Sequence, residues 1–88
     1  MKISAIIIHP KDTVACLLHD HRAGDAVTLE TGVSVLLKSD IPMGHKVALR
    51  SLSKGTPVIK FGAVIGYATE DILPGEHVHL NNLQGGLR

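Results

Sequence analysis

The chain has 88 residues, with nine basic and eight acidic side chains and a formal net charge of +1. That length allows one small domain, and a hydrophobic fraction of 44% indicates a globular chain rather than a disordered one. Balanced charge and only two aromatic residues, Phe61 and Tyr67, argue against nucleic acid as the main partner. The apolar runs are too short for a membrane span or for the core of a signal peptide. The single cysteine, Cys16, cannot form an internal disulfide, so we predict a cytoplasmic protein.

The predicted elements are short strands separated by turns. In chain order they cover residues 4–8, 33–38, 58–61 and 63–69, with Gly62 marking a turn and Gly66 a bulge. Residues 12–18 allow two interpretations: one or two turns of helix capped by Asp12, or a buried strand. The sequence therefore predicts an all-β fold with at most one short helix. A single domain covers residues 1–84, and a flexible tail follows at residues 85–88.

A ten-residue pattern, D-x-x-x-G-x-x-V-x-L, begins at Asp20 and recurs at Asp40 and Asp71, with a weaker copy at Ser51. Its Asp and Gly are typical of a tight turn, and the V-x-L alternation that follows is typical of a half-buried strand. Residues 20–49 map onto residues 51–80 with an offset of 31, which indicates an internal duplication. Two copies are too few for a solenoid, so we expect them to pack against each other within one domain.

Four segments carry a resemblance to a known family: residues 7–15, 41–49, 54–69 and 75–83, which read IIHPKDTVA, IPMGHKVAL, KGTPVIKFGAVIGYAT and GEHVHLNNL. In this order, and over nearly the whole chain, they resemble the N-terminal domain of altronate and galactarate dehydratases. The resemblance implies a SAF-type β-clip fold that either precedes a much larger dehydratase region or forms a separate small subunit. The small subunit of sulfolactate sulfo-lyase is similar as well.

The resemblance implies that the chain is the small subunit or N-terminal domain of a sugar-acid hydro-lyase and is inactive alone. It further implies a large dehydratase subunit as partner, a sugar acid as substrate, and a divalent metal such as iron that the large subunit mostly holds. No cofactor is assigned to this chain by itself. Position 81 is Asn81 where the family motif is expected to carry a further histidine, so the metal ligands stay unassigned.

His77 and His79 form an H-x-H pair around Val78. Residues two apart on a strand project from the same face, so both imidazoles are expected on one face and Val78 in the core. Two imidazoles on one face can coordinate a metal, bind a carboxylate or shuttle a proton. The alternative is a solvated strand face without a function. Two ligands do not fill a coordination shell, so a complete metal site is not expected.

His45 and Lys46 follow the turn at Gly44, where a basic pair beside backbone amides suits a carboxylate. An exposed polar turn is the alternative. Lys60 replaces the apolar residue of the repeat and is either a cation directed at substrate or partner, or a strand-end lysine reaching water. The predicted catalytic residues are His45, His77 and His79, and the predicted substrate-binding residues are Lys46, Lys60 and Asn81. We expect the basic groups to form one anion-receiving surface.

Weaker candidates and rival functions remain open. His9 is a minor site candidate, His19 and His21 are expected to be exposed, and Cys16 is expected to be a buried small hydrophobic residue. The rivals are the small subunit of a sulfo-lyase and a non-catalytic assembly module. An ice- or carbohydrate-binding module is disfavoured, because no flat threonine-rich or aromatic surface is evident. Unpaired edges of short strands also favour homo-oligomers in the absence of the large subunit.

Overall fold

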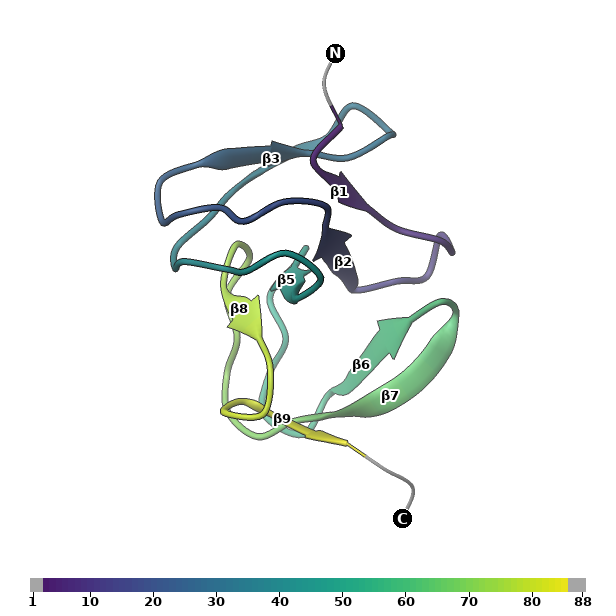
Figure 1. Ribbon diagram of the computed structural model, residues 1–88. Coiled ribbons are helices and arrows are strands. Elements are labelled where there is room, and N and C mark those ends of the chain that lie inside the picture. The colour runs from purple at the N-terminus through teal and green to yellow at the C-terminus, as the bar shows by residue number, and fades with distance from the viewer. Residues whose placement is uncertain (1–2, 86–88) are drawn as a thin grey trace.

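The computed structural model describes residues 3–85, in which nine short strands and no helix occur. The strands are β1 (Ala5–Ile6), β2 (Val14–Leu17), β3 (Ala26–Thr28), β4 (Ser34–Leu36), β5 (Lys46–Ala48), β6 (Pro57–Lys60), β7 (Ala63–Ala68), β8 (His77–Val78) and β9 (Leu83–Gly85). They form three antiparallel sheets, ordered β1-β2-β5-β8, β3-β4 and β6-β7-β9. Figure 1 shows β3 at one end of the molecule, the β6-β7-β9 sheet at the other, and β2, β5 and β8 between them. The predicted all-β fold is confirmed, and none of the described residues belongs to a membrane-spanning helix.

Residues 14–17 form a strand, so the helical interpretation of this segment is wrong. β2 pairs with β1 on one side and with β5 on the other, and it is buried toward both faces. Asp12 caps no helix, because its carboxylate accepts hydrogen bonds from the backbone amides of Ile8, His9 and Gly62. A strand that is buried on both faces has a continuous apolar sequence, which periodicity cannot distinguish from a buried helix.

The remaining predicted strands are present, with differences at their ends. The strand expected to continue to Leu80 ends at Val78, because the chain turns there and leaves Leu80 83% exposed. The bulge predicted at Gly66 is confirmed by a register shift between β6 and β7. β9 has no counterpart in the prediction, and within it Gly85 pairs with Gly66. Gly85 is the first residue of the predicted tail, and the other residues of that tail, 86–88, lie outside the described part of the chain.

Hydrogen bonds repeat along the chain with the predicted offset of 31 residues. The Asp40 carboxylate accepts from the amide of Ala23 at 2.9 Å, and the Asp71 carboxylate accepts from the amide of Lys54 at 2.9 Å. The isolated antiparallel bridges repeat in the same way: they are His21–Ile41 and Leu52–Ile72. The internal duplication is confirmed, because in each copy the aspartate of the second turn holds the first turn of the same copy.

Two hydrophobic cores follow the duplication, one on each face of the central β1-β2-β5-β8 sheet. β5 contributes Val47 to the first core and Ala48 to the second, and both side chains are fully buried. Within residues 20–49 and 51–80, four pairs of core positions are related by the 31-residue offset: Val27 and Val58, Leu37 and Ala68, Ile41 and Ile72, and Val47 and Val78. Burial of both faces fixes the positions of β5 and β8, the strands on or next to which His45, Lys46, His77 and His79 lie.

Asp12 is 2% exposed and ties residues 8–9 to the β6–β7 turn. Burial raises the pKa of this carboxyl. Hydrogen bonds from backbone amides outweigh that effect and lower the pKa below the ordinary 3.8; the amides are those of Gly62, Ile8, His9 and Phe61. A lowered folded-state pKa means that Asp12 stabilises the fold above its unfolded-state pKa, and that this contribution is lost as the pH falls through the folded-state pKa.

We therefore expect Asp12→Asn to reduce the free energy of unfolding by about 1–3 kcal/mol at neutral pH, because the amide cannot accept all of these bonds. The difference from the wild type should shrink as the pH falls below about 4. Urea unfolding of both proteins across this pH range measures it. A difference that stays constant down to a pH of about 2.5 would show that the charge of Asp12 contributes nothing.

Candidate functional site

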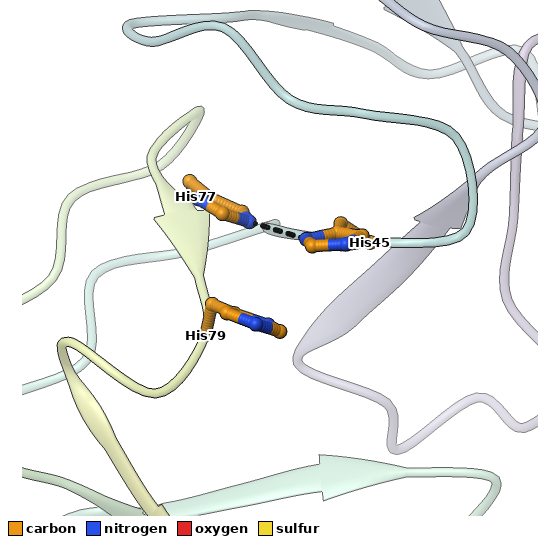
Figure 2. Close-up of side chains that lie close together, drawn as sticks. All are labelled: His45, His77 and His79. Atoms are coloured by element: carbon orange, nitrogen blue, oxygen red, sulfur yellow. Dashed lines mark hydrogen bonds between the residues drawn. The ribbon is translucent and has the colours of Figure 1, made fainter.

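Pairing of β5 with β8 brings the two parts of the candidate site together. In this antiparallel pair Lys46 lies opposite Val78, and Val47 lies opposite His77. One step further along the same register, His45 faces His79. Residues opposite each other in an antiparallel pair project from the same face, as do residues two apart on one strand. The three histidines therefore share one face. Figure 2 shows the rings of His77 and His45 directed toward each other, with the His79 ring below them.

The three imidazoles form a compact cluster. Nδ1 of His45 and Nε2 of His77 are 2.9 Å apart and share a hydrogen bond. The ring centroids are 5.1 Å apart for His45 and His77, 4.4 Å for His45 and His79, and 5.3 Å for His77 and His79. All three side chains are half-buried. The structure thus joins the three predicted catalytic residues in a single group, which we call the histidine cluster.

Asn82, which the sequence analysis passes over, holds the backbone beneath the histidine cluster. Its side chain is buried, donates from Nδ2 to the carbonyl of His77 at 2.7 Å, and accepts at Oδ1 from the amide of His79 at 2.9 Å. The His77 amide donates to Oγ of Ser39 at 3.2 Å. Asn82 is therefore a positioning residue. Its sequence signal is weak, because an asparagine in a turn after a strand usually bonds its own local backbone.

Local electrostatics favour a neutral His77. Burial lowers the pKa of this imidazole, and the nearby positive charges of His45, His79 and Lys46 lower it further. A neutral imidazole keeps a nitrogen lone pair that can accept a proton, a hydrogen bond or a metal ion. His77 is thus suited to act as a base or ligand near neutral pH, rather than as a permanent cation.

Lys46 does not share the face of the histidine cluster, and Lys60 lies in another sheet, at the end of β6. Strand alternation places Lys46 on the opposite face, in register with Val78 and Cys16. Burial and the positive charge of Lys60 lower the pKa of Lys46. Lys60 ends β6, and its Nζ lies 4.7 Å from the centroid of the Phe61 ring. The single basic surface expected from the sequence is therefore divided between two faces.

A polar pocket of about 300 Å³ adjoins the cluster at His77. Asn81 also lines the pocket. The other lining residues are three carboxylates, Glu70, Asp71 and Glu76, and the two residues that hold the backbone of the site, Ser39 and Asn82. Asn81 itself is exposed. The pocket therefore offers hydrogen bonds to hydroxyl groups, while its carboxylates oppose an anion unless a cation accompanies it.

The weaker candidates lie elsewhere. His9 packs against the turn at Gly62, where an added Cβ would meet its ring at 2.8 Å. His19 is exposed as expected, whereas His21 is half-buried and its Nδ1 lies 3.2 Å from the Asp25 carboxylate. Cys16 is half-buried on β2. No interaction joins any of these side chains to the histidine cluster among the described hydrogen bonds and ring contacts.

Comparison with known proteins identifies the family of this domain. The family model described as the altronate/galactarate dehydratase SAF domain matches residues 3–86. The chain belongs to this SAF domain family. The resemblance inferred from the four sequence segments is thereby confirmed, and the all-β structure agrees with it.

Individual members of the SAF domain family show how much of each relative the chain represents. It is 40% identical over 84 residues to altronate dehydratase of Bacillus subtilis (strain 168), covering 96% of this chain and 17% of that protein. It is 44% identical over 82 residues to altronate dehydratase of Escherichia coli (strain K12), covering 93% and 16%. The chain thus spans about a sixth of these enzymes.

A third relative is shorter. The chain is 51% identical over 45 residues to (2R)-sulfolactate sulfo-lyase subunit alpha of Paracoccus pantotrophus, which covers 51% of this chain and 67% of that subunit. The chain is therefore similar both to a part of long dehydratases and to a much shorter subunit.

Proposed function

We propose that this SAF domain is the small subunit or N-terminal domain of a sugar-acid hydro-lyase of the altronate dehydratase type. In this proposal it binds the anionic substrate where it meets a larger lyase polypeptide, and it is inactive alone. The observation that carries the proposal is the convergence of His45, His77 and His79 on one face of a domain from this family.

Dehydration of a sugar acid breaks the C–H bond next to the carboxylate, and the proton passes to a base. The hydroxyl on the neighbouring carbon then leaves and takes up a proton to become water. A divalent metal such as iron, held mostly by the larger polypeptide, would assist the departure of the hydroxyl. Neutral His77 is suited to hold or pass a proton, and His45 and His79 are suited to hydrogen-bond the carboxylate and hydroxyls.

Asn81 and the two lysines take different places in this proposal. Asn81 would donate hydrogen bonds to substrate hydroxyls from the rim of the pocket beside His77. Lys46 lies on the opposite face of the central sheet and Lys60 at the end of β6. Their positive charges would attract the anionic substrate over a distance or bind acidic groups of the larger polypeptide. Their contribution would therefore weaken as the ionic strength rises.

A second candidate is the small subunit of a sulfo-lyase, in which sulfite leaves instead of hydroxyl. It is supported by the 51% identity over 45 residues to the sulfolactate sulfo-lyase alpha subunit. Both reactions need an anionic substrate held beside a base, so the histidine cluster suits either.

The test is capture of the natural partner with a tagged form of this chain, followed by assays of altronate dehydration and sulfolactate desulfonation. We expect one reaction to require both polypeptides, so that each alone turns over substrate at least about 100-fold more slowly than the complex. Equal turnover by the captured partner with and without the chain would contradict the proposal and would leave an assembly role for the domain.

A further inference from the structure

The histidine cluster has the composition of a metal site as well as that of a substrate site. One nitrogen of each of His45, His77 and His79 lies within 4.8 Å of the other two. Nitrogens that are each about 2.1 Å from one ion lie roughly 3.0–3.4 Å from one another. The His45–His77 pair, at 2.9 Å, is just below that range, and rotation of the half-buried His79 ring would bring its nitrogen to the same spacing.

The spacing of the ring centroids suits a shared ion. The ring planes are nearly parallel, at 29°, 26° and 8° to one another, so the rings would turn about their side-chain bonds when an ion binds. An imidazole centroid lies about 3.2 Å from a metal bound at a ring nitrogen, so rings bound at 90–109° to one another have centroids about 4.5–5.2 Å apart. The three observed centroid distances are 4.4, 5.1 and 5.3 Å. One proton lies between Nδ1 of His45 and Nε2 of His77 in their hydrogen bond. If that proton moves to the other nitrogen of its own ring, both facing nitrogens have a free lone pair for the ion.

The backbone around the cluster is held as metal ligands usually are. Asn82 fixes both ends of the H-x-H segment, and Ser39 bonds the His77 amide. β5 and β8, which bring the rings together, are anchored by fully buried Val47 and Val78. Ligands on a rigid scaffold lose little conformational entropy when an ion binds, which favours affinity.

We propose that His45, His77 and His79 bind one divalent first-row transition metal ion, with protein ligands on one side of the ion and open positions on the other. Three imidazoles without a thiolate suit ions such as Zn²⁺, Co²⁺ and Fe²⁺, and they leave the ion its full charge of +2. Three protein ligands with an open position are typical of a site that binds a further small ligand. The carboxylate and hydroxyls of a hydroxy acid are ligands of that kind.

This inference goes beyond the proposed function, since it concerns a ligand of the isolated chain and does not depend on any lyase reaction. The test uses the 88-residue chain, titrated with Co²⁺ and followed by visible absorption, and with Zn²⁺ followed by calorimetry. We expect one ion per chain. We also expect the ¹⁵N signals of three imidazoles to shift together in NMR spectra as the ion binds.

Variants separate the cluster from other histidines. We expect His45→Ala, His77→Ala and His79→Ala each to weaken binding by about 100-fold, because two imidazoles hold an ion poorly. The matched control is the double variant His19→Ala/His21→Ala, which should bind as the wild type does. NMR spectra of the backbone amides check that each variant is folded. If His77→Ala is unfolded, His45→Ala decides, because its side chain lies before β5 begins.

Two results would overturn the proposal. One is failure of the wild-type chain to bind either ion more tightly than the triple-alanine variant of the cluster. The other is binding that the folded cluster variants retain and the His19/His21 variant loses. If the cluster variants lose metal binding but keep lyase activity in the assembled enzyme, the metal site stands and the proposed function is rejected. The two proposals therefore fail in distinguishable ways.

Discussion

Replacement of both His77 and His79 with alanine is expected to lower kcat/KM of the assembled lyase by about 10²–10⁴-fold, the range typical of a lost acid–base or substrate-orienting group. The two rings project from one face beside His45, while Val78 between them anchors the strand in the core. Removal of the imidazoles should therefore leave the fold and the complex intact. Steady-state assays of the captured complex, with its composition checked by size-exclusion chromatography, measure the effect.

The matched control for this double variant is His19→Ala, an exposed histidine outside the cluster, which should keep kcat/KM within about twofold. Wild-type activity in a complex that carries both His77→Ala and His79→Ala would assign the domain to assembly alone. A complex that fails to form would show that the cluster lies in the interface, and the activity per complex would then be measured at saturating partner concentration.

The second large effect is on stability, at Gly75. This glycine has a φ of +89° and donates its amide to the carbonyl of Ala48 at 2.9 Å. A Cβ built there would lie 2.1 Å from the carbonyl oxygen of Leu36. We expect Gly75→Ala to reduce the free energy of unfolding by about 3–5 kcal/mol, through left-handed backbone strain and overpacking against main chain. An 88-residue domain has little more than this to lose.

The duplication supplies an exact internal control for Gly75. Gly44 stands 31 residues earlier, has a φ of +83°, and has nothing within 4 Å of an added Cβ. Gly44→Ala should therefore cost only the backbone strain, about 1–2 kcal/mol. Urea unfolding of both variants measures the difference. Equal destabilisation at the two positions would contradict the close packing of Gly75 against β4.

The sequence contained the information for the repeat and for most of the strands. The Asp–Gly turn followed by V-x-L encodes local structure, which is why the duplicated bonds of Asp40 and Asp71 could be anticipated. Residues 14–17 could not be resolved in this way, because burial on both faces removes the alternation that marks a strand. Gly85 was beyond local prediction, since β9 exists only by pairing with β7.

The candidate site was predictable in part. The shared face of His77 and His79 follows from strand geometry, but the arrival of His45 beside them depends on the β5–β8 register, which joins residues about 30 positions apart. Adjacent residues of a strand project from opposite faces, so Lys46 and His45 are separated. The sequence interpretation placed both residues in a turn and therefore did not predict this separation. Asn81 and Asn82 lie side by side in the same turn, and only Asn82 bonds the backbone of His77 and His79, a difference that two consecutive asparagines do not reveal in the sequence.

The central claim is that His45, from one copy of the duplication, acts with His77 and His79, from the other, as a single site. The most direct test compares kcat/KM of the assembled lyase for His45→Ala, for the His77/His79 double variant and for the triple variant. A single site predicts strongly non-additive losses, with the triple variant within about threefold of the double variant. Losses that multiply, as they do for independent residues, would contradict the claim.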